Sequence, residues 1–133
     1  MKSKLEIEVG EMQIFSLHEM DLASIFEDIA SIIKIKGEIN LYSSQHIKEC
    51  IENFVIKGKN IFFIDLSEVS YIDSSGLGAF LSIHSKIYKS GGGVHLCAPS
   101  PKVNYVLELT KLKGLLNVFS SLEEGIDSVK NKK

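Results

Sequence analysis

The sequence contains few cysteines and no long apolar run, and both features exclude whole classes of protein. Its two cysteines, Cys50 and Cys97, lie in separate apolar stretches and form no C-x-x-C pair. We therefore expect buried, reduced thiols rather than a disulfide framework. No apolar run approaches the length that spans a bilayer, and the start of the chain lacks the continuous apolar stretch of a signal peptide. These features favour a cytoplasmic protein with no membrane span.

A strong charge excess, internal repeats and low-complexity linkers are also missing. The formal net charge is −2 for 133 residues, which argues against direct nucleic-acid binding, because such proteins usually carry a basic face. A chain of this length can bury one core without disulfides or metal. We therefore expect residues 1–133 to form a single domain.

Strand-like and helix-like patterns alternate along the chain, which predicts an α/β fold with a mostly parallel central sheet. Early in the chain, Leu5–Val9 is expected to form a strand ended by Gly10, Met12–Leu17 could extend a strand, and a helix capped by Asp21 should cover Leu22–Ile29. Further strands are expected over 31–36 (stopped by Gly37), 61–66, 94–98 and 116–119, and helices from Ser43 or Ser44 to about Gly58, over 75–90, from Ser100-Pro101, and over 121–129.

The segment after the buried strand 61–66 is the strongest candidate for a site, because sites in open α/β sheets form at the carboxyl ends of strands. It places Ser74 and Ser75 beside the first free amides of a helix, those near Gly76 and Leu77. A helix start favours an anion, so a phosphate esterified to Ser74 would lie in a favourable field. By spacing alone, Asp73 or a serine at this place is usually just a helix cap.

The run Ile64–Gly78, IDLSEVSYIDSSGLG, resembles the STAS domain family and, within it, the bacterial anti-sigma factor antagonists. The family pattern is a strand ending in Asp-Leu, a short turn, and Asp-Ser-Ser/Thr/Ala-Gly-Leu-Gly. Upstream, Gly37–Asn40 is similar to the family's Gly-Glu-(Ile/Leu)-Asp, and the downstream segments 107–110 and 118–124 resemble the family's ending. The resemblance implies a STAS-type fold: a mixed sheet of four to five strands with a parallel centre and helices packed mainly on one face.

The resemblance also implies a function. Family members of this type are not enzymes but substrates: an anti-sigma factor that is also a serine kinase phosphorylates the first serine of the motif, and a metal-dependent serine phosphatase reverses the reaction. The unphosphorylated protein binds the kinase and frees the sigma factor, which regulates transcription. Carried over to this chain, the phosphorylation site is Ser74, and the surrounding loop and partner-binding residues are Asn40, Asp73, Ser75, Gly76, Leu77 and Gly78.

Two departures from the family pattern leave the role of the protein open. Asn40 stands where the family usually has aspartate, and residues 10–30 look like an insertion between the first two strands, which the family commonly joins by a tight turn. Gly76 and Gly78 are expected to let another backbone or a nucleotide approach closely. The alternative within the fold is an unphosphorylated STAS scaffold or interaction subunit of a signalling or membrane-associated complex.

Enzymatic alternatives have weaker support. A hydrolase would use Ser74 or Ser75 with His84 or His95 as base, but the segment lacks the G-x-S-x-G elbow. The glycine triplet 91–93 is not followed by Gly-Lys-Ser/Thr, so it indicates a turn rather than a phosphate-binding loop. The four histidines show no metal-ligand spacing. We therefore expect no catalytic residue, no metal and no cofactor.

Overall fold

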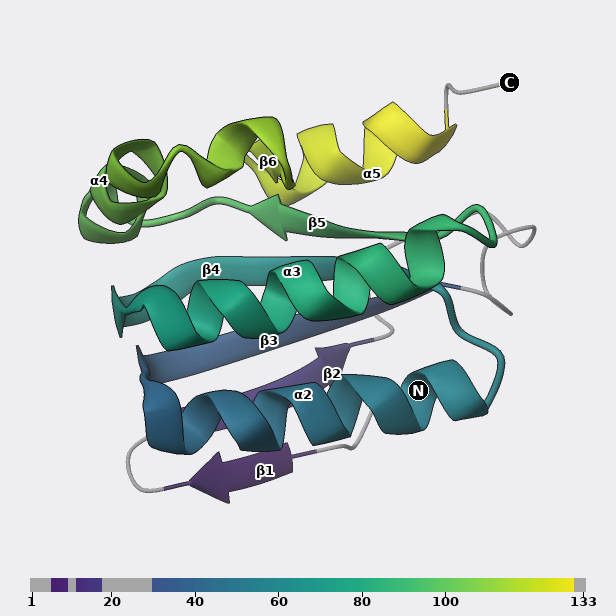
Figure 1. Cartoon of the computed structure of the whole chain (residues 1–133), viewed down its shortest axis with the longest axis horizontal. Helices are drawn as coiled ribbons and strands as arrows, with labels where there is room; N and C mark the ends of the chain where they lie inside the picture. Colours follow the sequence, from purple (N-terminus) through teal and green to yellow (C-terminus); the bar gives the residue numbers. More distant parts are fainter. Residues whose placement is uncertain (1–5, 10–11, 18–29, 131–133) are drawn as a thin grey trace.

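The computed structural model describes residues 6–9, 12–17 and 30–130, which form one mixed sheet covered by helices (Figure 1). The strand order is β1-β2-β3-β4-β5-β6. The strands are β1 (Glu6–Val9), β2 (Met12–Leu17), β3 (Ala30–Ile39), β4 (Ile61–Ile72), β5 (Gly93–Cys97) and β6 (Asn117–Phe119). The helices are α2 (Leu41–Ile56), α3 (Ser74–Tyr88), α4 (Pro101–Thr110) and α5 (Leu122–Lys130), with a short 3-10 helix, η1 (Leu112–Gly114).

The sheet confirms the predicted parallel centre. Strands β3, β4, β5 and β6 run parallel, whereas β2 is antiparallel to both β1 and β3. The number of strands is six rather than the expected four to five, because Met12–Leu17 does not extend the first strand. It turns back instead, with Val9 opposite Met12, and pairs on both of its edges. Of the expected insertion at 10–30, residues 12–17 and Ala30 therefore belong to the sheet. The helix expected over Leu22–Ile29 lies outside the described residues.

The two faces of the sheet bury different sets of side chains. On β4, the side chains of Phe62, Ile64 and Leu66 point into the larger core, which they share with α2, α3 and α4. On the opposite face, Phe63 packs with residues of α5, so the described helices lie mainly on one side of the sheet, as predicted. Burial of such large apolar side chains stabilises each by about 1.5–3 kcal/mol relative to exposure.

Strands β3 and β4 are both longer than the sequence pattern indicated. Gly37 does not stop β3; it has a φ of 104° and lies where the pairing with β4 shifts register. A glycine accepts this positive φ without the steric penalty of a side chain, so β3 continues to Ile39. Strand β4 likewise runs beyond Leu66 to Ile72, and Ile39 pairs with Ile72. Both strands thus end at the same level of the sheet.

Helices α2 and α3 follow directly from these two strand ends and lie next to one another across the sheet (Figure 1). The buried side of α3 consists mainly of Gly76, Leu77, Phe80, Ile83 and Ile87. His84 is half-buried, and Tyr88 at the end of the helix is 67% exposed. The common level of the strand ends brings the first turns of α2 and α3 together at one edge of the sheet.

Candidate functional site

Asn40 and Asp73 occupy equivalent positions, each between the end of a parallel strand and the start of a helix. Both have extended backbone conformations, with φ of −132° and −113°. The backbone N–H of Asp73 donates a hydrogen bond to the carbonyl oxygen of Ile39 at 3.2 Å, which joins the two strand-to-helix junctions. The junctions therefore form a single preorganised surface rather than two independent loops.

Asp73 is the N-cap of α3, and it accepts hydrogen bonds from backbone amides that the sequence had suggested would be free. Its Oδ1 atom accepts hydrogen bonds from the backbone N–H of Ser75 at 2.9 Å and of Gly76 at 3.2 Å. The N–H of Leu77 donates to the Asp73 carbonyl oxygen at 3.2 Å. The expectation that the amides near Gly76 and Leu77 are available to an anion is therefore wrong, because Asp73 already accepts from both. A phosphate on Ser74 would lie beside a carboxylate that has taken those donors.

The two serines of the motif differ in accessibility. Ser74, the first residue of α3, is exposed, and its hydroxyl group forms no hydrogen bond with the other described residues. Ser75 is half-buried, and its amide is held by the Asp73 carboxylate. A protein that modifies a hydroxyl group must surround it, so Ser74 is the more accessible acceptor of the two.

Gly76 and Gly78 have opposite surroundings. A Cβ atom added to Gly76 would lie 2.5 Å from Ile39 Cγ2 and 2.9 Å from Ile72 Cγ1, so Gly76 allows the start of α3 to pack closely on the two strand ends. The expectation that Gly76 makes room for a partner or nucleotide is wrong, since its own core fills that space. A Cβ atom at Gly78 would meet nothing within 4 Å. Leu77 is fully buried and belongs to the core.

Asn40 caps α2 through a reciprocal pair of hydrogen bonds. Its Oδ1 accepts from the backbone N–H of Tyr42 and of Ser43, both at 3.0 Å, while Ser43 Oγ accepts from the N–H of Asn40 at 2.9 Å. This capping box stabilises the helix start. The prediction that Ser43 or Ser44 is the cap is wrong: the helix begins at Leu41, and both serines are buried in its first turn.

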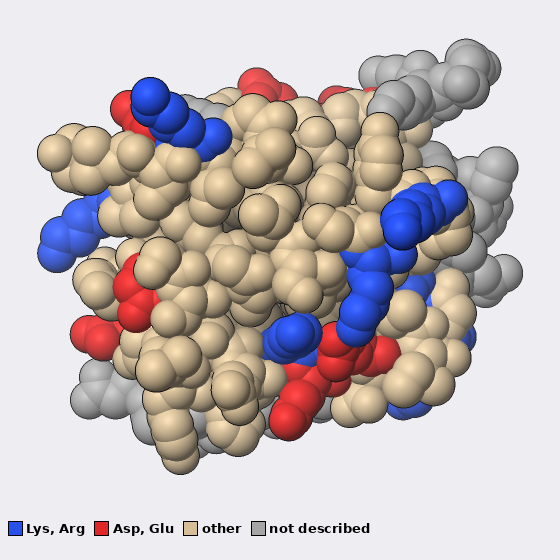
Figure 2. Space-filling view, viewed as in Figure 1, with Lys and Arg blue, Asp and Glu red and all other residues tan. Residues whose placement is uncertain are grey.

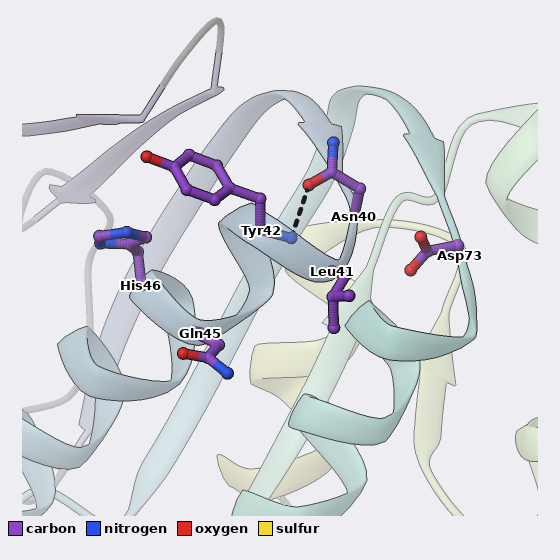
Figure 3. A pocket seen from close by; sticks show the side chains of 6 residues that line it. All are labelled: Asn40, Leu41, Tyr42, Gln45, His46 and Asp73. Atoms are coloured by element: carbon purple, nitrogen blue, oxygen red, sulfur yellow. Dashed lines mark hydrogen bonds between the residues drawn. The ribbon is translucent and has the colours of Figure 1, made fainter.

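A shallow hollow of about 560 Å³ lies at the start of α2 and reaches Asp73 (Figure 3). Two large apolar side chains at its edge are strongly exposed, Leu41 at 67% and Tyr42 at 71%. The Tyr42 ring meets the His46 ring edge-on at a centroid distance of 5.7 Å. The residues that line the hollow are Asn40, Leu41, Tyr42, Gln45, His46 and Asp73.

Sequence reasoning missed four of these lining residues because it placed the helix start two or three residues too late. The signal was present: Asn40 is followed at the third position by Ser43, the spacing of a capping box. A helix that begins at Leu41 turns Ile47, Cys50 and Ile51 toward the core. Leu41 and Tyr42 then lie at an exposed helix start.

The histidines give no support to a hydrolase. His84 follows Ser74 by ten positions in α3, which corresponds to about 15 Å along the helix axis. Its Nδ1 atom accepts a hydrogen bond from the Val94 N–H at 3.0 Å, and burial lowers its pKa from 6.5. His95 is buried, stacked against Phe119 at a centroid distance of 6.0 Å. Neither imidazole is placed to act as a base for Ser74.

The glycine triplet and the two cysteines have structural explanations. The glycine triplet forms a turn, with a φ of 90° at Gly91, as predicted. Cys50 and Cys97 are free and buried, and burial raises their pKa values to about 11 and about 12. Within the described ranges, no group of three or more His, Cys, Asp or Glu side chains could hold a metal ion.

Comparison with known proteins shows similarity to one family along most of the chain. The sequence profile of the STAS domain matches residues 23–125. A candidate anti-sigma factor antagonist of Thermotoga maritima is 33% identical over 109 residues, which are 81% of this chain and 96% of that protein. The anti-sigma-B factor antagonist of Bacillus subtilis is 31% identical over 94 residues, 71% of this chain and 85% of the relative.

The chain belongs to the STAS domain family and, within it, to the anti-sigma factor antagonists.

Solved STAS structures share the fold. The crystal structure of the Thermotoga maritima protein superposes with a TM-score of 0.73 at 31% identity, covering 79% of this chain and 90% of that one. The anti-sigma factor antagonist SpoIIAA in its unphosphorylated form gives a TM-score of 0.67 at 23% identity, covering 80% and 92% of the two chains. SpoIIAA has also been solved in its phosphorylated form. In the described part of this STAS protein, no helix is both long and apolar enough to cross a membrane.

Proposed function

We propose that this STAS protein is an anti-sigma factor antagonist that regulates transcription from the cytoplasm and is switched by phosphorylation of Ser74. In its unphosphorylated form it binds an anti-sigma factor that is also a serine kinase, so that the sigma factor is released. Phosphorylation of Ser74 ends that binding. The observation that carries the proposal is the exposure of Ser74, directly after the capping carboxylate of Asp73, on the first turn of α3.

The physical basis of the switch is electrostatic. A phosphate adds about −1.5 to −2 charges at neutral pH. The amides of Ser75 and Gly76 already donate to Asp73, so they are not available to the phosphate. The charge of the phosphate therefore adds to that of the neighbouring carboxylate. An apolar or acidic partner face is repelled or left poorly solvated by such a group.

The fold need not change for this switch to act. The Asp73–Ile39 hydrogen bond and the close packing of Gly76 on Ile39 and Ile72 hold the start of α3 in place. The protein acts as substrate and ligand rather than as enzyme, with no direct contact to nucleic acid. A metal-dependent serine phosphatase would restore the binding form.

The proposal is tested by capture from lysates of the source cells. Immobilised Ser74→Ala protein should retain a protein kinase of the anti-sigma factor type, and Ser74→Asp protein should not, because the added carboxylate stands in for part of the phosphate charge. Ser75→Ala is the matched control and should behave like the unchanged protein. Equal retention of that kinase by the Ala and Asp variants of Ser74 would contradict the proposal.

A scaffold function without phosphorylation is the second candidate, and Asn40 favours it. Asparagine caps α2 but lacks the charge of the aspartate that this family usually has there. In a scaffold, substitutions of Ser74 by Ala and Asp would leave partner binding equal, and incubation with a kinase of the anti-sigma factor type would add no phosphate.

A further inference from the structure

A second hollow, of about 440 Å³, lies at the edge of the sheet where the parallel strands begin. It is lined by residues at the starts of β4 and β6, Ile61 and Asn117, and by His95 of β5 and Val129 of α5. The full length of β4, which is 12 residues or roughly 35 Å, separates this edge from the junction beside Ser74. The second hollow therefore lies outside the proposed partner surface. Its volume is within the range of about 300–1,000 Å³ that small-molecule sites occupy.

The wall of the second hollow contains a buried polar side chain. His95 is only 9% exposed, and its ring packs against those of Phe63 and Phe119, at centroid distances of 5.2 and 6.0 Å. Its Nδ1 atom lies 3.3 Å from the carbonyl oxygen of Phe62. That oxygen can only accept, so Nδ1 carries a proton and the ring is held in one orientation. Small-molecule sites use a few fixed polar groups of this kind to orient a ligand.

The charge of the second hollow favours an anion. Among the described residues that line it, Lys89 is the only one that carries a full charge, and none is acidic. The exposed Lys89 side chain forms no ion pair with the rest of the described chain. Figure 2 shows lysine side chains (blue) over the ends of α2 and α3, and one of them, Lys86, is paired with Glu52. Lys89 is therefore available to bind a negative group.

The carbonyl groups at the end of α3 do little to oppose an anion there. The backbone N–H groups of Ser90 and Gly92 donate to the carbonyl oxygen of Ile87 at 3.1 and 3.0 Å, and that of Gly91 donates to Tyr88 at 3.0 Å. These bonds satisfy carbonyl groups that a helix end otherwise leaves without partners. They reduce the partial negative charge that the helix places at this end.

The remaining lining side chains are apolar or aromatic. Ile61 and Val129 are aliphatic, and the ring of Tyr88, which is 67% exposed, lies 5.4 Å from the ring of His84. An inorganic anion would leave these side chains uncovered. An anion that carries an apolar ring would bury them, and burial of apolar surface stabilises a complex.

We propose that the second hollow binds a small carboxylate that carries an apolar ring. The carboxylate lies on the Lys89 ammonium group and the Asn117 side-chain amide, and the ring packs against Ile61, Val129 and Tyr88. His95 supplies the fixed polar group in the wall. This binding site goes beyond the proposed function and does not depend on it, because phosphorylation of Ser74 takes place at the opposite edge of the sheet.

The test is an NMR titration of the full chain, labelled with a nitrogen isotope, with benzoate as the probe. Benzoate should shift the backbone amide signals of Lys89, Gly92, His95 and Asn117 to saturation, with a Kd of about 1–10 mM, as expected for so small a ligand. Benzamide has nearly the same shape but no charge, and it should bind at least about 3-fold more weakly. The proposal is overturned if these signals show no saturable shift up to about 50 mM benzoate, or if benzamide binds equally well.

Lys89→Gln tests the charge of the site. It should weaken benzoate binding by about 3-fold, the size expected for one exposed ion pair. Lys102→Gln is the matched control: Lys102 is also exposed but lies at the start of α4, at the opposite edge of the sheet. The control should bind benzoate like the unchanged protein. Equal weakening by both variants would show that benzoate responds to net charge rather than to this site, which would overturn the proposal.

Tyr88→Ala tests the contact with the ring. It should weaken benzoate binding by about 3-fold or more through lost apolar contact, whereas Tyr105→Ala, which removes a tyrosine of similar exposure on α4 (63%), should not. Unchanged affinity of both Tyr88→Ala and Lys89→Gln would place the bound benzoate elsewhere and overturn the proposal. Melting temperatures of the variants should equal that of the unchanged protein, because all four positions are exposed.

Discussion

The backbone N–H of Asp73 lies 3.2 Å from the carbonyl oxygen of Ile39 and donates a hydrogen bond to it. This single contact links the start of α3 to the end of the strand that precedes α2. It fixes the cap residues of two helices, Asn40 and Asp73, at one edge of the sheet. A switch at Ser74 can then work on a rigid surface, and its effect depends on charge rather than on refolding.

Gly76→Ala should destabilise the protein, and Gly78→Ala should not. The added methyl group at position 76 would meet the side chains of Ile39 and Ile72 at under 3 Å, and overpacking of this kind costs about 1–3 kcal/mol. At position 78 the methyl group meets nothing within 4 Å, and alanine favours a helix by up to about 1 kcal/mol over glycine. Urea unfolding of both variants measures these effects. Equal stability of the two variants would contradict the packing described for Gly76.

Substitutions of Asp73 should separate its capping role from its charge. Asp73→Ala removes the acceptor for the Ser75 and Gly76 amides and should lower the free energy of unfolding by about 1 kcal/mol. Asp73→Asn keeps an acceptor and should cost only a few tenths of a kcal/mol. In the Asn variant, phosphorylation of Ser74 should reduce partner binding less than in the unchanged protein, because one of the two adjacent negative charges is gone. An equal reduction would show that the Asp73 charge takes no part in the switch.

The free energy of unfolding should decrease as the pH is lowered through the range where His84 titrates. Burial lowers the pKa of His84 in the folded state from 6.5, and its Nδ1 accepts from the Val94 N–H, which a protonated nitrogen cannot do. The unfolded chain therefore binds a proton at higher pH than the folded one. The stabilising contribution is complete above pH 6.5 and is lost as the pH falls below that value toward the lowered pKa.

The comparison that isolates this effect is between the unchanged protein and His84→Gln, which can accept the same hydrogen bond but does not titrate. Chemical unfolding at about pH 8 and about pH 5.5 compares the stability above and below the ordinary histidine pKa of about 6.5. The difference in stability between the two pH values should be smaller in the Gln variant. Identical pH dependence in both proteins would place the titrating group elsewhere.

The two thiols should resist alkylation while the protein is folded. Burial raises the pKa of Cys50 to about 11 and that of Cys97 to about 12, and the thiolate is the reactive form. Intact mass after iodoacetamide treatment near neutral pH should show no addition to the native protein and two additions to the denatured protein. Rapid labelling of the folded protein at either residue would contradict the burial seen here.

The sequence pattern predicted the α/β alternation and most elements, because the spacing of apolar residues within a single segment is visible in the sequence itself. It failed for the second half of β4. There the buried residues are Leu66, Val69 and Ile72, spaced by three because the pairing with β3 shifts register twice. A register shift is a property of two strands together, so the alternation rule applied to one strand cannot reveal it.

The candidate site was predicted in part for a similar reason. The cap at Asp73 follows from local sequence, and family resemblance supplied the expected phosphorylation of Ser74. The occupied amides near Gly76 and the hollow at Leu41 and Tyr42 depend on where each helix begins and on how two junctions meet. Those facts belong to the tertiary structure.

The most direct test of the central claim measures phosphorylation and binding in one sample. The protein is incubated with ATP and the kinase retained by Ser74→Ala, the modified residue is located by peptide mass spectrometry, and the affinity of the phosphorylated product for the same kinase is determined. We predict a single phosphate on Ser74, none on Ser75, and a loss of affinity of at least about 10-fold, consistent with removing 1.4 kcal/mol or more. Phosphate on another residue, or undiminished affinity of the Ser74-phosphorylated protein, would contradict the account.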